Sequence, residues 1–276
     1  MNFSDEYLEH FSRHIRLPEL TKAGQEKISQ VEVLIVGAGG LGSAAMTYLA
    51  TLGVKRLGLI DPDNVELSNL PRQIVHKPAT VGQSKVASAA ERLKELNPDI
   101  KLTVMEERFK AANVLKIMPA YDVIIDGTDN FPAKFLLNDA AVMLKKPLVH
   151  SGVLRWGGQV MTILPGKSAC YRCIFPEPPP PGTIPTCAEA GIFNTVAGVG
   201  GLIQATEAAK IITGIGNPLT NRLLVFDLLM MNFRLIDIKR DENCPVCGKS
   251  PTIKSLNDLI RCEVKSQRGV CLNDGN

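Results

Sequence analysis

The sequence has little net charge and few aromatic residues. Its 31 Lys and Arg residues nearly balance 28 Asp and Glu residues, leaving a formal charge of +3, and Phe, Trp and Tyr make up 5% of the chain. Proteins that bind nucleic acids present basic stripes and aromatic stacking surfaces. Because the chain has neither, we expect no nucleic-acid partner.

The sequence also has no long hydrophobic run. Residues 1–16 are polar and mixed in charge, without the apolar stretch of a secretory leader. The longest weakly polar segment, residues 191–205, contains Asn194 and Gln204 and is too short to span a bilayer. We therefore expect no membrane association and a cytoplasmic location.

Hydrophobic residues nevertheless make up 45% of the 276 residues, enough for a substantial core. Short β-branched segments alternate with helix-like segments over the first 150 residues. This alternation predicts a Rossmann-like α/β fold with a doubly wound, mostly parallel sheet. Strands are expected at residues 31–36, 56–60, 101–105 and 121–125. Helices are expected within 1–30 and at 43–50, 83–97, 111–118 and 131–145.

After residue 147 the pattern changes to consecutive strands, which should continue the sheet in antiparallel fashion. A Pro-rich loop with four successive prolines leads into one long helix of small residues. The expected elements are strands at 148–154, 159–164, 222–229 and 233–239, the loop at 165–187 and the helix at 188–213. Residues 253–276 are poorly patterned, and we expect a loosely docked tail there.

A glycine-rich turn follows the first expected strand, with Gly37, Gly39, Gly40 and Gly42, and Asp61 ends the next strand. Glycines let the backbone approach phosphates, the free N–H groups at a helix start bind them, and the carboxylate accepts ribose hydroxyls. This context predicts a nucleotide site, with a tight structural turn as the alternative. The turn alone does not distinguish NAD from ATP.

The polar segment after the second strand favours a triphosphate. It contains Asp63, Asn69, Arg72 and Gln73, and Lys85 stands at the start of the next helix. Arg bridges phosphate oxygens and Lys supplies a compact charge, so both stabilise charge that develops at phosphorus. A dinucleotide dehydrogenase has no need of this set. The alternative is a solvated loop, because single charged residues are usually on the surface.

The segment Asp126-Gly127-Thr128-Asp129-Asn130 follows the fourth expected strand. In open α/β sheets ligands gather at the carboxyl ends of the strands. Mg²⁺ prefers carboxylate oxygens together with substrate phosphates. The segment therefore predicts a magnesium site, with a helix N-cap at Asp129 or Asn130 as the alternative reading.

Four of the seven cysteines form two C-x-x-C pairs, Cys170 with Cys173 and Cys244 with Cys247. Four thiolates without an open position make a structural tetrahedral zinc site. A redox role is the alternative, but neither pair opens a helix in a thioredoxin-like unit. We expect Zn²⁺ to tie the chain after the last strand to the loop before the prolines.

Cys187 stands between the Pro-rich loop and the expected long helix. The dipole at a helix start favours the thiolate, which makes Cys187 a candidate nucleophile or sulfur-transfer residue. The alternative is a small buried apolar side chain. Cys262 and Cys271 have no partners at metal-binding spacing, and we assign them no role.

Together these motifs resemble the MoeB/ThiF/HesA family of adenylyltransferases, relatives of the ubiquitin-activating enzymes. The resemblance covers about residues 8–252 and includes Arg13 in Phe11-Ser12-Arg13-His14-Ile15. Within the family, the chain is most similar to the molybdopterin-synthase adenylyltransferase branch, notably in the Pro-rich loop. It implies one adenylating domain over residues 1–252. Within it, the nucleotide-binding core is expected at about 31–150 and a carrier-binding and zinc part at about 151–252.

The resemblance also implies a reaction. A small ubiquitin-like sulfur-carrier protein presents its C-terminal Gly-Gly carboxylate to the α-phosphorus of Mg-ATP, which gives an acyl-adenylate and pyrophosphate. Residues beyond 251 show no rhodanese-like pattern, so sulfur should come from a separate cysteine desulfurase or rhodanese-like protein. Molybdopterin biosynthesis is the expected pathway, and the thiamine-pathway carrier is the alternative.

Residue roles follow from the same resemblance. Asp61 binds ribose, Asp129 serves Mg²⁺, and Cys187 is the position where a thiol can join the activated carrier. Arg13 reaches into the neighbouring subunit's site, which requires a homodimer. The phosphates are assigned to Asn69, Arg72, Gln73 and Lys85.

Two other classes stay open on the sequence alone. An NAD-dependent oxidoreductase would rest on the glycine turn and leave Arg72, Lys85 and the paired cysteines without a use. A zinc-stabilised binding module would use the cysteines but leave the nucleotide motifs unexplained.

Overall fold

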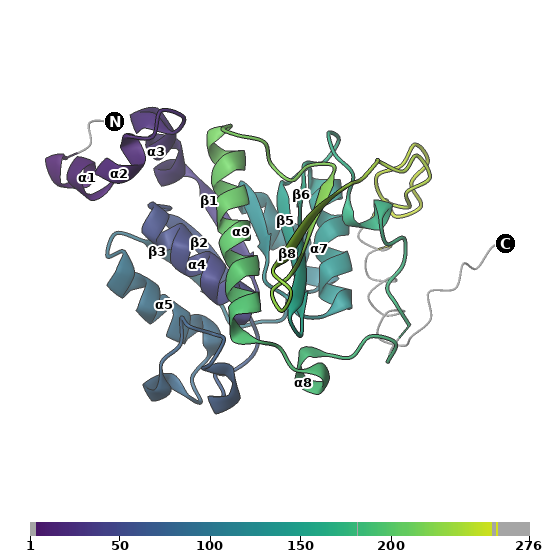
Figure 1. Ribbon diagram of the computed structural model, residues 1–276, viewed down its shortest axis with the longest axis horizontal. Coiled ribbons are helices and arrows are strands. Elements are labelled where there is room, and N and C mark those ends of the chain that lie inside the picture. Colours follow the sequence, from purple (N-terminus) through teal and green to yellow (C-terminus); the bar gives the residue numbers. More distant parts are fainter. Residues whose placement is uncertain (1–3, 181, 256–257, 259–276) are drawn as a thin grey trace.

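An eight-stranded sheet with helices on both faces forms the centre of the protein, in a computed structural model that describes residues 4–180, 182–255 and 258 (Figure 1). The strands are β1 Glu32–Val36, β2 Arg56–Ile60, β3 Lys101–Met105, β4 Val123–Asp126, β5 Leu148–Leu154, β6 Gly157–Ile163, β7 Arg222–Asp227 and β8 Asn232–Asp237. The helices are α1 Asp5–His10, α2 Ser12–Ile15, α3 Thr21–Gln30, α4 Gly40–Leu52, α5 Lys85–Leu96, α6 Ala111–Ile117, α7 Phe131–Leu144, α8 Cys187–Ala190 and α9 Asn194–Thr213.

The sheet has the strand order β3-β2-β1-β4-β5-β6-β7-β8. Neighbouring strands from β3 to β5 are parallel, whereas β5 to β8 pair in antiparallel fashion. The order reverses direction at β1, where β2 lies on one side and β4 on the other, and such a switch point is where open α/β sheets bind ligands. The predicted fold class, a doubly wound parallel sheet continued by antiparallel strands, is confirmed.

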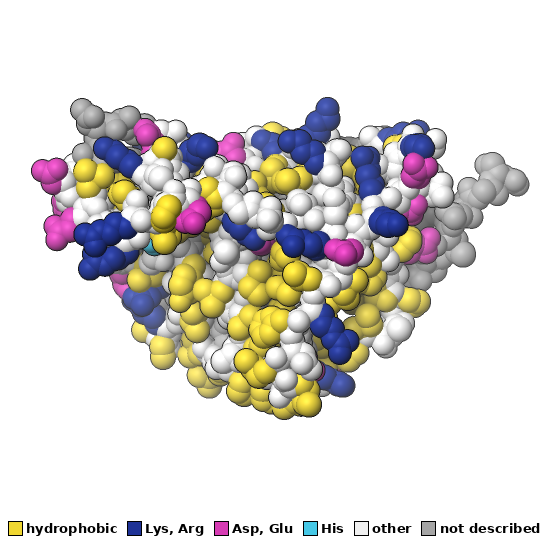
Figure 2. Space-filling view, turned by 45° about the horizontal axis from the view of Figure 1, so that its top comes forward, with side chains coloured by type: hydrophobic (Ala, Val, Ile, Leu, Met, Phe, Trp, Pro, Cys, Tyr) yellow, Lys and Arg dark blue, Asp and Glu magenta, His cyan; other side chains and the backbone are white. Residues whose placement is uncertain are grey.

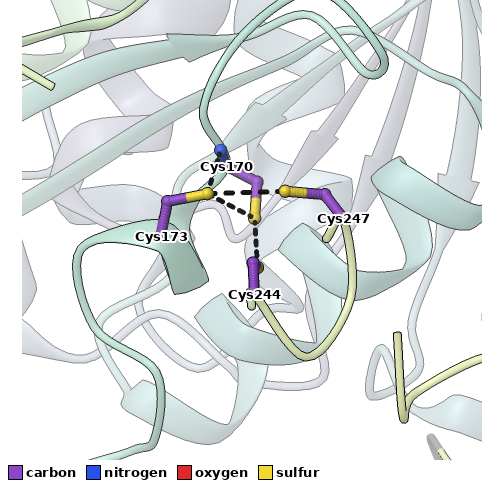
Figure 3. Close-up of side chains that lie close together, drawn as sticks. All are labelled: Cys170, Cys173, Cys244 and Cys247. Atoms are coloured by element: carbon purple, nitrogen blue, oxygen red, sulfur yellow. Dashed lines mark hydrogen bonds between the residues drawn. The ribbon is translucent and has the colours of Figure 1, made fainter. Parts of the chain in front are cut away.

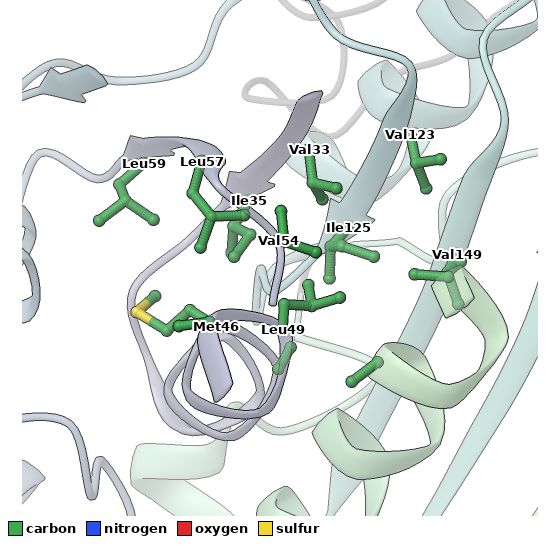
Figure 4. Packing of buried hydrophobic residues seen from close by; sticks show 14 of the residues in the cluster. Val33, Ile35, Met46, Leu49, Val54, Leu57, Leu59, Val123, Ile125 and Val149 are labelled. Carbon is green, nitrogen blue, oxygen red and sulfur yellow. The ribbon is translucent and has the colours of Figure 1, made fainter. Parts of the chain in front are cut away.

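Strands β1, β2 and β4 are buried on both faces because their apolar side chains alternate between two cores, whereas β3 at the sheet edge has no buried residue. Val33 and Ile35 of β1 belong to one core and Leu34 to the other. On the first face, Met46 and Leu49 of α4 lie against strand side chains (Figure 4). Helices α3, α4, α5 and α9 contribute to this core, and α6 and α7 contribute to the opposite one.

The prediction of one helix at 188–213 is wrong. The chain forms the four-residue α8, turns at Gly191 with φ +77°, and begins α9 at Asn194. Long-range backbone bonds explain the break. Arg155, in the β5–β6 turn, donates its N–H to Gly191 O at 3.1 Å and accepts the N–H of Phe193 at 2.9 Å.

The remaining expectations are settled only in part. None of the helices in the described part of the chain combines the length and apolar composition needed to cross a membrane. The predicted tail lies largely outside the described residues, as do Cys262 and Cys271. The division near residue 150 stays a prediction, and β5 runs across it.

Candidate active site

A cavity of about 730 Å³ opens where β1, β2 and β4 end. It also receives the first residues of α4, α5 and α7, so several helix N-termini with free N–H groups face it. Most of the predicted site residues line it. These are Gly37, Gly39, Gly40, Asp61, Asp63, Arg72, Gln73, Lys85, Asp129, Asn130 and Cys187.

The glycine turn after β1 packs directly against the turn after β4. Gly37 has φ +97°, and a Cβ there would lie 2.6 Å from the carbonyl oxygen of Gly127. Gly42 does not line the cavity; a Cβ at this position would meet Gly37 O at 1.9 Å. Gly37 therefore shapes the cavity wall, whereas Gly42 lets α4 pack under the turn.

Asp61 is held at the glycine turn by backbone donors. Its Oδ2 accepts the N–H of Ala38 at 2.7 Å and its Oδ1 accepts the N–H of Asp63 at 2.9 Å. Burial raises the pKa of this carboxyl above its ordinary value, although both hydrogen bonds oppose the shift. The carboxylate is thus held in one orientation beside the glycine turn, and its ribose-binding role stays a prediction.

Two cations also line the cavity. Lys85, the first residue of α5, donates its Nζ to Asp63 Oδ2 at 3.0 Å. Arg72 donates to the carbonyl of Ser68 at 2.8 Å. Asn69 does not line the cavity: its Oδ1 accepts the N–H of Glu66 at 3.1 Å, so its side chain fixes the loop that presents Arg72.

The carboxylates after β4 separate into two environments. Asp129 is exposed and lines the cavity, so one carboxylate is available to share Mg²⁺ with phosphates, as this ion prefers. Asp126 is buried and does not line the cavity, and its Oδ2 accepts from Lys134 at 3.1 Å and His150 at 2.7 Å. Asn130 caps α7 by accepting the N–H of Ala133 at 3.0 Å.

Sequence reasoning missed several cavity residues, among them Arg108, Lys134 and Tyr171. Arg108 comes from the segment after β3, and Tyr171 stands between the cysteines of the first pair. Neither belongs to a nucleotide motif. The sequence could have indicated Lys134 as a cavity residue. It lies one helical turn after the N-cap Asn130, at the end of α7 that faces the cavity.

Cys187 lies at the start of α8 and lines the cavity, and its candidate role as a nucleophile stays a prediction. Burial, with a smaller contribution from the Asp129 charge, raises the pKa of this thiol. Its Sγ donates to the carbonyl of Val153 at 3.5 Å. Because α8 has only four residues, its dipole gives the thiolate little support.

Arg13 does not line the cavity of its own chain. It is exposed on α2, where its guanidinium donates to Ser12 Oγ at 3.1 Å. Its predicted action in a neighbouring subunit stays a prediction.

The four paired cysteines converge at one point (Figure 3). Sγ of Cys170 lies 3.9 Å from that of Cys173 and 3.6 Å from that of Cys244, and Cys173 Sγ lies 3.4 Å from Cys247 Sγ. Tetrahedral Zn²⁺ with Zn–S bonds of about 2.3 Å requires sulfurs roughly 3.8 Å apart. The residues therefore fit the predicted structural zinc site.

The surroundings of this cysteine cluster support a closed site. The N–H groups of Cys170 and Asp241 each donate to Cys173 Sγ at 3.4 Å, which favours a thiolate. A Cβ at Gly248 would lie 2.6 Å from Cys244 O, so only glycine fits the second loop. None of the four cysteines is among the residues that line the cavity.

The sheet and the cavity at its switch point define the class of α/β proteins that bind nucleotides beside a glycine turn. The chain belongs to the ThiF family, whose family model matches residues 11–246. This membership agrees with the predicted resemblance.

The comparisons with individual proteins extend this result. The chain is 42% identical over 263 residues to a sulfur carrier protein adenylyltransferase of Thermus thermophilus, covering 94% of this chain and 97% of that protein. It is 45% identical to the maize adenylyltransferase and sulfurtransferase MOCS3-1, covering 87% of this chain but only 52% of that longer protein. The chain is accordingly an enzyme of the adenylyltransferase class.

The fold also occurs in a solved structure. Escherichia coli MccB superposes with a TM-score of 0.80 at 23% identity, over 91% of this chain and 75% of MccB. At this identity the likeness establishes the shared fold.

Proposed function

We propose that the chain transfers AMP from ATP to the C-terminal Gly-Gly carboxylate of a small ubiquitin-like sulfur-carrier protein. The observation that carries the proposal is the meeting of the glycine turn, Asp61, Arg72, Lys85 and Asp129 in one cavity. The Thermus relative, named for this activity, matches over nearly its whole length. Cations around bound phosphates suit adenylyl transfer, whereas hydride transfer from NAD has no need of them.

Each of these residues has a separate role in the reaction. Asp61 accepts the ribose hydroxyls, and the N–H groups at the start of α4 approach the phosphates. A carrier carboxylate oxygen attacks the α-phosphorus while the bond to the bridging oxygen of the β-phosphate breaks, giving acyl-adenylate and pyrophosphate. Arg72 and Lys85 stabilise the charge that moves onto pyrophosphate. Asp129 would hold Mg²⁺, which when bound would supply further positive charge at the phosphates.

An exposed apolar surface supports a protein substrate. Figure 2 shows hydrophobic side chains gathered over the middle and lower part of one face, below a band rich in Lys and Arg. Large apolar residues are exposed along β8 and the turn before it, and such patches mark interaction sites. They are Leu229, Met230, Met231, Phe233, Leu235 and Ile236. We propose that the folded body of the carrier rests here while its tail enters the cavity.

The pathway is a finer part of the proposal. We assign the chain to molybdopterin biosynthesis, with the thiamine-pathway carrier as the second candidate, and a separate cysteine desulfurase or rhodanese-like protein as the later sulfur donor. The maize relative, which is named both adenylyltransferase and sulfurtransferase, is nearly twice as long as the matched region.

Isotope exchange between pyrophosphate and ATP tests the proposal. We expect exchange only when a carrier with a free Gly-Gly end is added, and the carrier that supports it identifies the pathway. A carrier truncated by its two terminal glycines is the matched control. Absence of exchange with molybdopterin- and thiamine-type carriers, or tight NAD binding without ATP binding, would contradict the assignment.

We also propose a homodimer in which Arg13 completes the partner's site. Chains with Arg13→Ala and chains with Lys85→Ala should each be inactive. Mixed dimers would then contain one intact site, so an equal mixture should recover about a quarter of the wild-type activity after subunit exchange. If Arg13 acted within its own chain, no mixture would recover activity.

A further inference from the structure

A buried carboxylate lies behind the turn that presents Asp129 to the cavity. Asp126, the last residue of β4, is fully shielded from solvent and accepts four hydrogen bonds. Its Oδ1 accepts from the N–H of Thr128 at 3.0 Å and from the hydroxyl of Thr128 at 2.6 Å. Its Oδ2 accepts from Lys134 at 3.1 Å and His150 at 2.7 Å. A buried carboxylate needs such donors to stay ionised.

The charge state of this group follows from its surroundings. Burial opposes ionisation of Asp126, but the Lys134 charge and the His150 hydrogen bond outweigh it and lower the pKa of the carboxyl. Burial lowers the pKa of His150, whose Nε2 has no hydrogen-bond partner in the part of the chain that the structure describes. The cluster is therefore an ion pair of Asp126 with Lys134, completed by a neutral imidazole that donates from Nδ1.

This ion pair connects three elements at the cavity wall. Through Thr128 it fixes the turn after β4, and through Lys134 it reaches the first turn of α7. Lys134 also donates to the carbonyl of Ser151 in β5 at 2.5 Å. Asp129 lies between the two fixed points, since Thr128 precedes it and the α7 N-cap Asn130 follows it.

We propose that Lys134 and His150 are positioning residues that hold Asp126 in place, so that the Thr128 turn keeps Asp129 where it meets the metal ion of Mg-ATP. The inference rests on the proposed function, because the metal-binding role of Asp129 is part of it. Lys134 does not act as a direct phosphate ligand: only 7% of its side chain is exposed, and its Nζ is already bonded to Asp126 and Ser151.

The test removes both charges together. In the double variant Asp126→Asn with Lys134→Met no lone charge is left buried, and replacing both partners of such a pair is commonly tolerated. We expect ATP to bind without Mg²⁺ as in the wild type, while the gain in affinity on adding Mg²⁺ is lost. The single-turnover rate of adenylate formation should fall about 100-fold, the typical cost of a roughly 1 Å misplacement.

Two further variants separate positioning from general stability. Thr128→Val removes one hydrogen bond without changing charge and should weaken the Mg²⁺ dependence in the same direction, by a smaller factor. Lys134→Arg keeps the positive charge and the N–H donors, so this variant should retain most of the Mg²⁺ dependence of ATP binding. Lys146→Met is the control, because Lys146 follows the same helix and donates to Pro119 O at 2.9 Å, away from the cavity.

Titration calorimetry with ATP, with and without Mg²⁺, distinguishes the outcomes. Wild-type Mg²⁺ dependence in both the double variant and Thr128→Val would overturn the positioning role while leaving the proposed function intact. If the wild-type chain itself bound no ATP, the proposed function would fail, and the inference with it.

Discussion

The parallel and antiparallel halves of the sheet differ in how they are stabilised and in what they expose. In β1 every residue after the first is buried, because helices cover both faces. In β8 all six residues are exposed. The parallel half is therefore stabilised by its two cores. The antiparallel half ends at an exposed strand, and the chain then continues into the cysteine cluster. The first half holds the candidate nucleotide site, and the second offers surface for a partner.

The largest expected effect concerns the cysteine cluster that secures the antiparallel half. Cys247→Ser should abolish metal binding and lower the free energy of unfolding by about 4 kcal/mol or more, the range typical of a lost structural metal. Denaturant unfolding and elemental analysis for zinc measure both. Cys187→Ser serves as the control and should keep the metal. An unchanged unfolding midpoint and zinc content in Cys247→Ser would show that the antiparallel half does not depend on a metal for its stability.

A change in the parallel half should impair chemistry with little effect on stability. Lys85→Ala should lower the rate of pyrophosphate exchange about 100- to 1000-fold, because a cation at the developing charge is removed. Stability should change little, since the Asp63 partner is 58% exposed and such pairs contribute little. Steady-state kinetics and thermal unfolding test this. Lys77→Ala, which breaks a surface pair with Glu95, should leave activity unchanged.

A smaller effect is expected at the exposed strand. Leu235→Asp on β8 should raise the KM for the carrier about tenfold, the loss of one interface contact, with ATP binding unchanged. Val104→Asp on β3, the opposite edge of the same sheet, is the matched control. Equal effects of the two substitutions on the KM would show that the two edges do not differ in partner binding.

The smallest effect concerns the reactivity of Cys187. Because its pKa is raised from the ordinary value of 9.0, its thiolate fraction at neutral pH is reduced. Iodoacetamide should alkylate it more slowly than a peptide of the same local sequence, with the rate rising at higher pH. Asp129→Asn removes a charge that raises this pKa and should speed the reaction. Peptide mapping by mass spectrometry gives the rates, and a faster reaction than the peptide would contradict the raised pKa.

Elements set by local pattern were predictable from the sequence. Strands β2 and β3 fall at the expected residues, because each is a short apolar segment bounded by polar residues; β2 is buried, whereas β3 is a partly exposed edge strand. The cysteine cluster was equally predictable from the sequence, since C-x-x-C spacing fixes the geometry of two sulfurs at a time. Most nucleotide-site residues came from the ends of predicted strands, which meet at one edge of a parallel sheet.

Features that depend on distant segments were not predictable. The break at Gly191 requires backbone bonds to Arg155, which no helix pattern reveals. The ion pair of Asp126 with Lys134, and its hydrogen bond from His150, join side chains from β4, α7 and β5 that no local motif connects. The raised pKa of Cys187 likewise comes from burial under other loops, whereas its position suggested the opposite shift.

The contact of Gly37 with Gly127 limits how this site can be redesigned. The two turns touch through their backbones, so lengthening either one, or adding a side chain at either glycine, would push the other away. A change in the shape of the cavity would therefore have to come from lining side chains outside this contact, such as those of Arg108 and Phe109.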